Sequence, residues 1–213
     1  NELGQKVLRK ITTDPMERKT LETFDVFGNL VSLEKQNASG KTLVHEAFFY
    51  NLNQKKTKQV STLFDPDKTI IKTWDYDSRS RLIELREAVG EPIEKVTHYT
   101  YTLDGHLETI TKPDGKTITY TYDGLGRQTS IHTSDGSCHY TLKYDQMGYV
   151  LESHDLIHGK VTKRTYSHFG ELLSETQANH QSLENTYDSL GRRTAMSFAN
   201  GSKVLYDYTP YHM

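Results

Sequence analysis

The sequence predicts an all-β chain made of antiparallel β-hairpin repeats. The first observation is an internal repeat, because Tyr-Asp-Gly-Leu-Gly-Arg at residues 122–127 recurs as Tyr-Asp-Ser-Leu-Gly-Arg at residues 187–192, and weaker copies fill the chain. The second is a further turn signal inside each interval, and the third is period-two alternation between the turns. Self-similarity at a fixed period is the signature of a repeat architecture.

Each copy of the motif opens with an aromatic residue, called the anchor below. Successive anchors are 26, 26, 25, 21, 22, 22, 21 and 21 residues apart. The wider spacing before Tyr101 predicts longer hairpins in the first half of the chain. The nine anchors are Phe24, Tyr50, Tyr76, Tyr101, Tyr122, Tyr144, Tyr166, Tyr187 and Tyr208.

The position four residues after each anchor predicts a turn. Six of these nine residues are glycine, the residue type that adopts positive φ most readily. Gln54 and Ser80 replace glycine in two copies, which we expect to form the turn differently. The nine positions are Gly28, Gln54, Ser80, Gly105, Gly126, Gly148, Gly170, Gly191 and His212.

A second turn is predicted about 14 residues after each anchor. Hairpin signals occur at residues 113–115 (Pro-Asp-Gly), 135–136 (Asp-Gly) and 200–201 (Asn-Gly). Weaker signals are His158-Gly159 and Ser39-Gly40, and Asn179-His180 is a degenerate version. Each repeat therefore contains two turns and two strands.

The segments between turns have the pattern of strands. Residues 116–122 alternate, with Ile118, Tyr120 and Tyr122 on one face and threonines on the other. The residue two positions before the anchor shares the anchor's face, and it is usually aromatic or apolar. We therefore expect an aromatic band across neighbouring strands. The polar exceptions at that position are Glu22, Arg164 and Asn185.

Composition and length favour one extended array over residues 1–213. Only 34% of the residues are hydrophobic and the mean hydropathy is -0.72, yet 14 tyrosines and regularly placed glycines argue against disorder. About eighteen strands exceed the roughly ten that a twisted open sheet usually holds, which predicts curling into a spiral or shell-like sheet.

Both ends of the sequence interrupt a repeat. Leu3-Gly4-Gln5 matches the motif without its anchor, and the chain stops soon after Tyr208. We therefore expect about nine repeats from a longer shell. The isolated piece is expected to self-associate through terminal strand edges.

Charge and apolar patterning exclude several classes of partner. The net charge is -2, with 26 basic and 28 acidic residues mixed throughout, which gives no case for nucleic acid. No apolar run reaches transmembrane length, so membrane insertion is not expected, and this segment has no signal peptide. Cys138 is the only cysteine, so an intrachain disulfide is impossible.

No calcium loop is expected in this sequence. Asp75, Asp77 and Arg79 alternate like the start of such a loop, but Arg79 replaces an oxygen ligand and no distal glutamate follows in register. A charged strand face is the preferred interpretation.

The histidines and the cysteine also fail to form a recognisable site. The histidines include His132, His139, His154 and His158, of which the last two flank a predicted turn. Cys138 and His139 are adjacent strand residues that point to opposite faces and so cannot form a thiol dyad. We expect no cofactor, no metal centre and no catalytic set, and hence not an enzyme.

The aromatic and arginine residues of the repeat have a structural and a functional interpretation. Exposed Tyr120, Tyr122 and their equivalents Tyr99, Tyr101 and Trp74 can stack on sugars or nucleobases, although regular repetition favours packing between strands. The arginines after the turn glycine, at 127, 192 and 193, are expected to pair with the motif aspartates 123 and 188 or with a neighbouring repeat's carboxylate. Anion binding is the minority alternative.

The Tyr-Asp-x-x-Gly-Arg motif at this spacing resembles the YD repeats of RHS-repeat proteins, which include polymorphic toxins, toxin-complex shell subunits, wall-associated proteins and teneurins. The resemblance implies an antiparallel sheet wound into a hollow shell, and a secreted or cell-surface location. The residues that carry it are Phe24, Gly28, Tyr76, Tyr101, Gly105, Tyr122, Asp123, Gly126, Arg127, Tyr144, Asp145, Gly148, Tyr166, Gly170, Tyr187, Asp188, Gly191 and Arg192.

Two functions from different classes remain open. The first is a non-catalytic shell segment that encloses a polypeptide cargo such as a C-terminal toxin. The second is an extracellular adhesion scaffold that binds glycans or proteins. A cargo domain downstream favours the first function, and adhesion modules favour the second.

Overall fold

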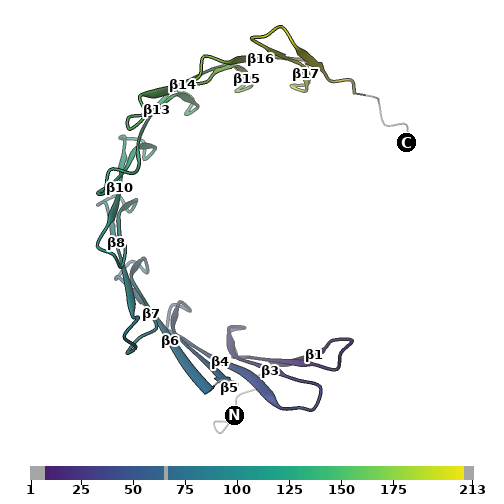
Figure 1. The fold of residues 1–213 in the computed structure, drawn as a ribbon, viewed down its shortest axis with the longest axis vertical. Helices are drawn as coiled ribbons and strands as arrows, with labels where there is room; N and C mark the ends of the chain where they lie inside the picture. Colours follow the sequence, from purple (N-terminus) through teal and green to yellow (C-terminus); the bar gives the residue numbers. More distant parts are fainter. Residues whose placement is uncertain (1–7, 65–66, 209–213) are drawn as a thin grey trace. The chain divides into compact units, whose positions relative to one another are not determined.

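The computed structural model describes residues 8–64 and 67–208 and confirms the all-β prediction. These residues form eighteen strands and no helix (Figure 1). Leu3, Gly4, Gln5 and His212 lie outside the described residues. The strands are β1 (Leu8–Thr13), β2 (Lys19–Phe24), β3 (Leu30–Gln36), β4 (Thr42–Tyr50), β5 (Lys56–Phe64), β6 (Asp67–Tyr76), β7 (Leu82–Glu87), β8 (Lys95–Tyr101), β9 (Leu107–Thr111), β10 (Thr117–Tyr122), β11 (Gln128–Thr133), β12 (His139–Tyr144), β13 (Val150–Asp155), β14 (Lys160–Tyr166), β15 (Leu172–Thr176), β16 (Ser182–Tyr187), β17 (Arg193–Phe198) and β18 (Lys203–Leu205).

The chain divides into two compact units, residues 1–100 with 110–115, and residues 101–109 with 116–213. In the first unit each strand from β1 to β8 pairs antiparallel with the next strand in sequence. In the second unit the same holds from β10 to β18. Each unit is thus a run of hairpins, as the repeat predicts.

The anchors end the even-numbered strands. Every even-numbered strand from β2 to β16 finishes on its anchor residue. The strand register shifts by one residue at seven of these anchors, so the strand that leaves the turn carries a bulge. These anchors are Phe24, Tyr50, Tyr76, Tyr122, Tyr144, Tyr166 and Tyr187.

The predicted turn glycines adopt positive φ, between 74° at Gly191 and 95° at Gly105. In the fourth-position turns, Gln54 and Ser80 also have positive φ, at 59° and 61°. The expectation that these two copies form a different turn is therefore wrong. They keep the same backbone and accept a left-handed conformation that costs a residue with a side chain roughly 1–2 kcal/mol.

The second set of turns is also confirmed. Positive φ occurs at Gly40, Gly115, Gly136, Gly159 and Gly201, and at His180, where the signal was degenerate. The longer hairpins expected in the first half are β4 and β5, with 9 residues each, and β6, with 10.

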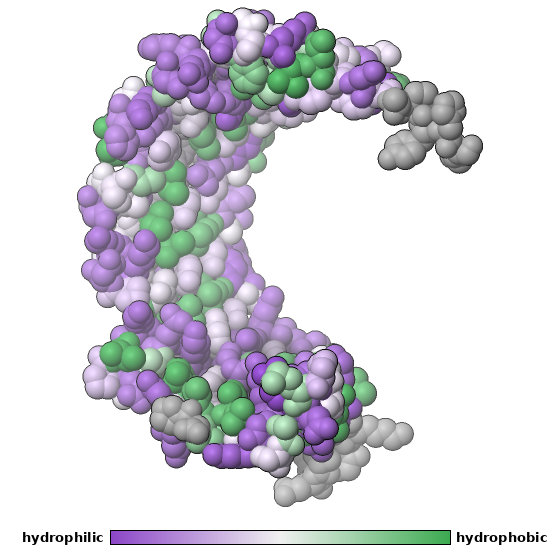
Figure 2. Space-filling view, turned by 45° about the vertical axis from the view of Figure 1, so that its right-hand side comes forward, coloured by the Kyte–Doolittle hydropathy of each residue, from purple (hydrophilic) through white to green (hydrophobic). Residues whose placement is uncertain are grey.

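Little of the described chain is fully buried. Only Leu21, Ala195 and Asn185 of the described residues are buried, and hydrophobic side chains lie in patches between hydrophilic ones (Figure 2). Two polar exceptions on the anchor face are neutralised by the residue directly opposite: Glu22 pairs with Lys10 at 3.2 Å and Arg164 pairs with Glu175 at 2.7 Å. Because so few described residues are buried, the folded array is stabilised mainly by contacts between neighbouring hairpins.

The described residues contain no helix long and apolar enough to cross a membrane.

Candidate functional site

The motif aspartate closes the turn after the anchor in five copies, at residues 25, 77, 123, 145 and 188. Asp123 Oδ1 accepts hydrogen bonds from the backbone N–H groups of Leu125 and Arg127, each at 3.0 Å. The N–H of Gly126 donates to the carbonyl of Asp123, which makes a tight turn with glycine in the left-handed position. Asp188 accepts the same two backbone bonds in its own turn. The motif therefore encodes a hairpin connection with a built-in side-chain cap.

The arginine after the turn glycine pairs with that aspartate, as expected. Arg127 donates from Nε to Asp123 Oδ2 at 2.7 Å, and Arg192 donates to Asp188 at 2.8 Å. Arg193 differs, because its guanidinium lies 6.0 Å from the ring centre of Tyr206. The interpretation as internal pairs is thus confirmed for the first two arginines.

The residue directly after the turn glycine also contacts the next repeat. The Arg127 guanidinium lies 4.8 Å from the ring centre of Tyr144 and donates to the carbonyl of Asp145 at 2.8 Å. His106 stacks on Tyr122, with ring centres 4.8 Å apart and planes inclined by 25°. A flat side chain after the turn therefore covers the following anchor ring. Two further examples are Tyr149 on Tyr166 and Arg192 on Tyr208.

The anchor hydroxyl reaches back to the preceding repeat. Tyr122 Oη donates a 2.7 Å hydrogen bond to the carbonyl of Leu107, which lies two residues after the turn glycine of that repeat. Seven anchors do this at distances of 2.6 to 3.3 Å. The donor and acceptor pairs are Tyr50 to Leu30, Tyr76 to Lys56, Tyr122 to Leu107, Tyr144 to Gln128, Tyr166 to Val150, Tyr187 to Leu172 and Tyr208 to Arg193.

We call this combination of anchor hydroxyl, stacked side chain and capped turn the repeat junction. Burial raises the pKa of the Tyr122 hydroxyl, which keeps it a donor. Hydrogen bonds from the Arg127 backbone N–H and then its side chain hold the pKa of Asp123 below its usual value. The junction thus holds a protonated phenol and an ionised carboxylate at neutral pH.

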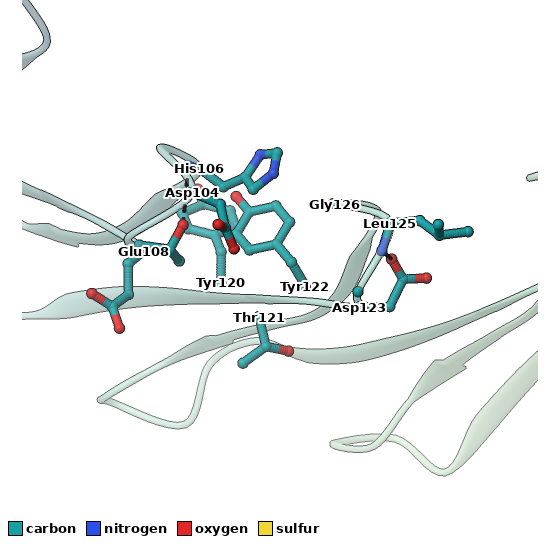
Figure 3. Close-up of a pocket in the computed structure, with 11 residues that line it drawn as sticks. Asp104, His106, Glu108, Tyr120, Thr121, Tyr122, Asp123, Leu125 and Gly126 are labelled. Atoms are coloured by element: carbon teal, nitrogen blue, oxygen red, sulfur yellow. Dashed lines mark hydrogen bonds between the residues drawn. The ribbon is translucent and has the colours of Figure 1, made fainter. Parts of the chain in front are cut away.

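A groove opens between successive turns at this junction (Figure 3). It has a volume of about 500 Å³ and is lined by the turn that holds Asp104 and His106 and by residues 120–126. Tyr120 and Tyr122 point into it while Thr121 points to the opposite face, which confirms the predicted alternation (Figure 3). An equivalent groove of about 460 Å³ lies between Phe169 and Leu190.

Both grooves are open, and two side chains of the first one are already engaged within the protein. In the first, Asp123 is already committed to its own turn, and the ring of Tyr122 is covered by His106. The stacking of anchor aromatics within the protein agrees with the packing interpretation of these residues. Farther along the anchor face, Lys56 lies 4.9 Å from the ring centre of Trp74.

Three of the residues considered for metal sites in the sequence each contact a partner near them in the chain. The charged strand face expected for Asp75, Asp77 and Arg79 is wrong, because only Asp75 lies in β6 and the other two lie in the turn that follows it. Asp77 caps this turn and pairs with Arg81 at 2.7 Å. His154 contacts Glu152 at 2.9 Å and His158 contacts Asp155 at 2.7 Å. Within the part of the chain that the structure describes, no three metal-ligating side chains gather.

Sequence reasoning missed the hydrogen bond from each anchor hydroxyl and the stacking across repeats. The available signal was chemical: the anchor is tyrosine in eight of nine copies, whereas packing alone accepts phenylalanine equally well. The stacking had a weaker signal, since the residue after the turn glycine is arginine, histidine or tyrosine in several copies.

The chain is similar to known proteins both in sequence family and in fold. The family model described as Teneurin YD-shell matches residues 14–209. The structure titled TcdB2-TccC3-Cdc42 is similar with a TM-score of 0.65 and 16% identity, over 88% of this chain and 12% of that chain. The structure titled TcdB2-TccC3-TEV has a TM-score of 0.55 and 14% identity, over 97% of this chain and 14% of that one. At these identities the likeness concerns the fold.

Proposed function

The chain belongs to the teneurin YD-shell family, and we propose that it is a stretch of shell wall that encloses a polypeptide cargo such as a C-terminal toxin. The observation that carries the proposal is the repeat junction. It ties each hairpin to the one before it by a tyrosine hydroxyl, at seven anchors of the described chain. A wall must hold many thin hairpins in register without a thick core, and a bond that recurs along the array does this.

The proposed mechanism is exclusion rather than chemistry. A continuous hydrogen-bonded wall keeps an enclosed polypeptide away from proteases and cell components. The protein acts as a non-catalytic structural element, in a secreted or cell-surface setting, and its immediate partners are adjacent repeats of the same parent chain. Neither nucleic acid nor membrane insertion is part of this function. Because the chain spans 12% and 14% of the two structures it resembles, the array over residues 1–213 is proposed as one piece of a larger shell.

The alternative is an exposed scaffold that binds glycans or proteins. Its best site is the groove of Figure 3, which offers acidic side chains and two tyrosines. However, glycan binding needs an uncovered aromatic face, and His106 stacks on Tyr122 in this groove. The covered face of Tyr122 therefore supports the shell wall over glycan binding at this ring.

The test uses the parent polypeptide with its downstream region and limited proteolysis as readout. Gly126→Val breaks one turn, because Gly126 has a φ of 78° that a β-branched residue rarely adopts, and Gly124→Ala is the control, with nothing within 4 Å of its Cβ position. We expect the downstream region to be protected in the parent and in the control but cleaved quickly in Gly126→Val. Equal cleavage with the array intact would instead establish an exposed scaffold.

A further inference from the structure

We propose that His132 and His139 form a binding site for a divalent transition-metal ion, with Zn²⁺ as the reference ligand. The two residues lie directly opposite each other on the antiparallel strands β11 and β12. Their imidazole ring centres are 5.6 Å apart, with planes inclined by 51°. This site is separate from the repeat junction and does not depend on the proposed function.

The backbone brings these two side chains close together. The carbonyl of His139 accepts a hydrogen bond from Leu156 N–H on the β13 side. Since the N–H and C=O of one strand residue point to the same side, His139 makes no ladder bond toward His132. The pair is therefore of the non-hydrogen-bonded kind, in which opposite side chains are nearest.

The ring separation matches bidentate chelation. A zinc ion about 2.0–2.1 Å from one nitrogen of each ring, at a roughly tetrahedral angle, places the ring centres about 5 to 6 Å apart. The observed 5.6 Å falls in this range. Zn²⁺, Cu²⁺ and Ni²⁺ all accept imidazole ligands, so the site selects this class of ion rather than Mg²⁺ or Ca²⁺.

Both rings are available for a ligand. Both residues are half-buried, so an ion can enter from solvent. The same face carries Thr119, opposite His132, and Thr141, two residues beyond His139. His154 lies opposite Thr141, and its ring is engaged with Glu152 at 2.9 Å. No third metal-ligating side chain joins them among the described residues, so water completes the coordination.

The hairpin that carries the pair is held by its own turn. Thr133 N–H donates to the Cys138 carbonyl at 2.9 Å, and Cys138 N–H donates to Thr133 Oγ1 at 3.0 Å. Gly136 has a φ of 71° in this turn. The two imidazoles are therefore presented by a preformed support, which lowers the cost of bringing them together on an ion. A bound ion then cross-links β11 to β12.

The experiment measures Zn²⁺ binding by calorimetry and the change in melting temperature with added Zn²⁺. We expect one principal site per chain, and a rise in melting temperature, because an ion that binds the folded state stabilises it. His132→Gln and His139→Gln should each weaken that site by roughly tenfold or more, since one imidazole alone loses chelation. Their double variant should abolish the zinc-dependent rise in melting temperature.

The control variants each replace a histidine outside the proposed site by glutamine. His45→Gln affects a ring that contacts Ser32 Oγ at 3.1 Å, and His154→Gln affects the ring beside Glu152. Both should leave Zn²⁺ affinity unchanged. Histidine imidazole NMR resonances provide a readout that needs no substitution: those of His132 and His139 should shift together up to one equivalent of Zn²⁺. Unchanged affinity in the pair variants, or uniform weak binding at all histidines, would overturn the proposal.

Discussion

The hydroxyl of Tyr122 lies 2.7 Å from the backbone carbonyl oxygen of Leu107, and this bond joins the end of one repeat to the start of a strand in the repeat before it. A backbone acceptor makes the link independent of the side chain at position 107. The same link therefore recurs onto leucine, lysine, glutamine, valine and arginine residues at other junctions.

The first prediction is that Tyr122→Phe destabilises the array by about 1 kcal/mol, the typical net contribution of one intramolecular hydrogen bond. The ring stays in place against His106, so packing is retained and only the link to Leu107 is lost. Urea denaturation followed by circular dichroism measures the change in unfolding free energy. Tyr120→Phe is the control, because Tyr120 lies in the same strand without a hydroxyl link to a neighbouring repeat. An equal loss in both variants would contradict a role for the hydroxyl bond.

The second prediction separates the two glycines of one turn. Gly126→Ala should cost at least about 1–2 kcal/mol, because Gly126 has a φ of 78° and an added Cβ meets His106 Nε2 at 2.6 Å. Gly124→Ala should be neutral or slightly stabilising, since nothing lies within 4 Å of its Cβ position. Thermal melts of the two variants provide the comparison. Similar melting temperatures would rule out the left-handed turn at 126.

The third prediction concerns a copy without glycine. Gln54 has a φ of 59°, so Gln54→Gly should relieve strain and stabilise the array by about 0.5–1 kcal/mol. Gln59→Gly, in the interior of β5, is the control and should destabilise, because glycine weakens a strand. The measurement is the urea midpoint of each variant. A loss of stability in Gln54→Gly would mean that the side chain contributes more than the backbone strain costs.

The strands and turns of this chain could be predicted from its sequence, because turn residues and the alternation of side chains along a strand are local signals. Tyr122 and Gly126 mark the strand end and the turn by residue type and spacing alone. Gln54 shows the limit of such reasoning: residue type suggested a different turn, but the hairpins on either side impose the left-handed backbone on it. Neighbouring structure overrides local preference at such positions.

The candidate sites could not be predicted in the same way, because they consist of side-chain contacts between strands and between repeats. His106 and Tyr122 belong to different repeats, and their stacking requires the strand register and the bulge at the anchor. His132 and His139 face each other only because the turn between them contains the right number of residues. A shift of one residue would send one of the two rings to the opposite face.

The last prediction is that acid destabilises the array. Backbone and side-chain hydrogen bonds from the following arginine lower the pKa of Asp77, Asp123 and Asp188, and a hydrogen bond from Lys143, followed by one from His154, lowers the pKa of Glu152 from 4.5 to about 2. A carboxyl group with a lower pKa in the folded state binds fewer protons there than in the unfolded chain. Its stabilising contribution is therefore complete above the unfolded pKa and is lost as the pH falls through the folded value.

The urea midpoint should accordingly be constant near neutral pH and fall progressively from about pH 4.5 towards pH 2. Added salt should reduce the effect, because these carboxylates are partly exposed. Glu152→Gln removes one group whose pKa is lowered in the folded state and should make the fall shallower. A midpoint that stays constant down to pH 2.5 would show that the ionised turn carboxylates do not support the folded array.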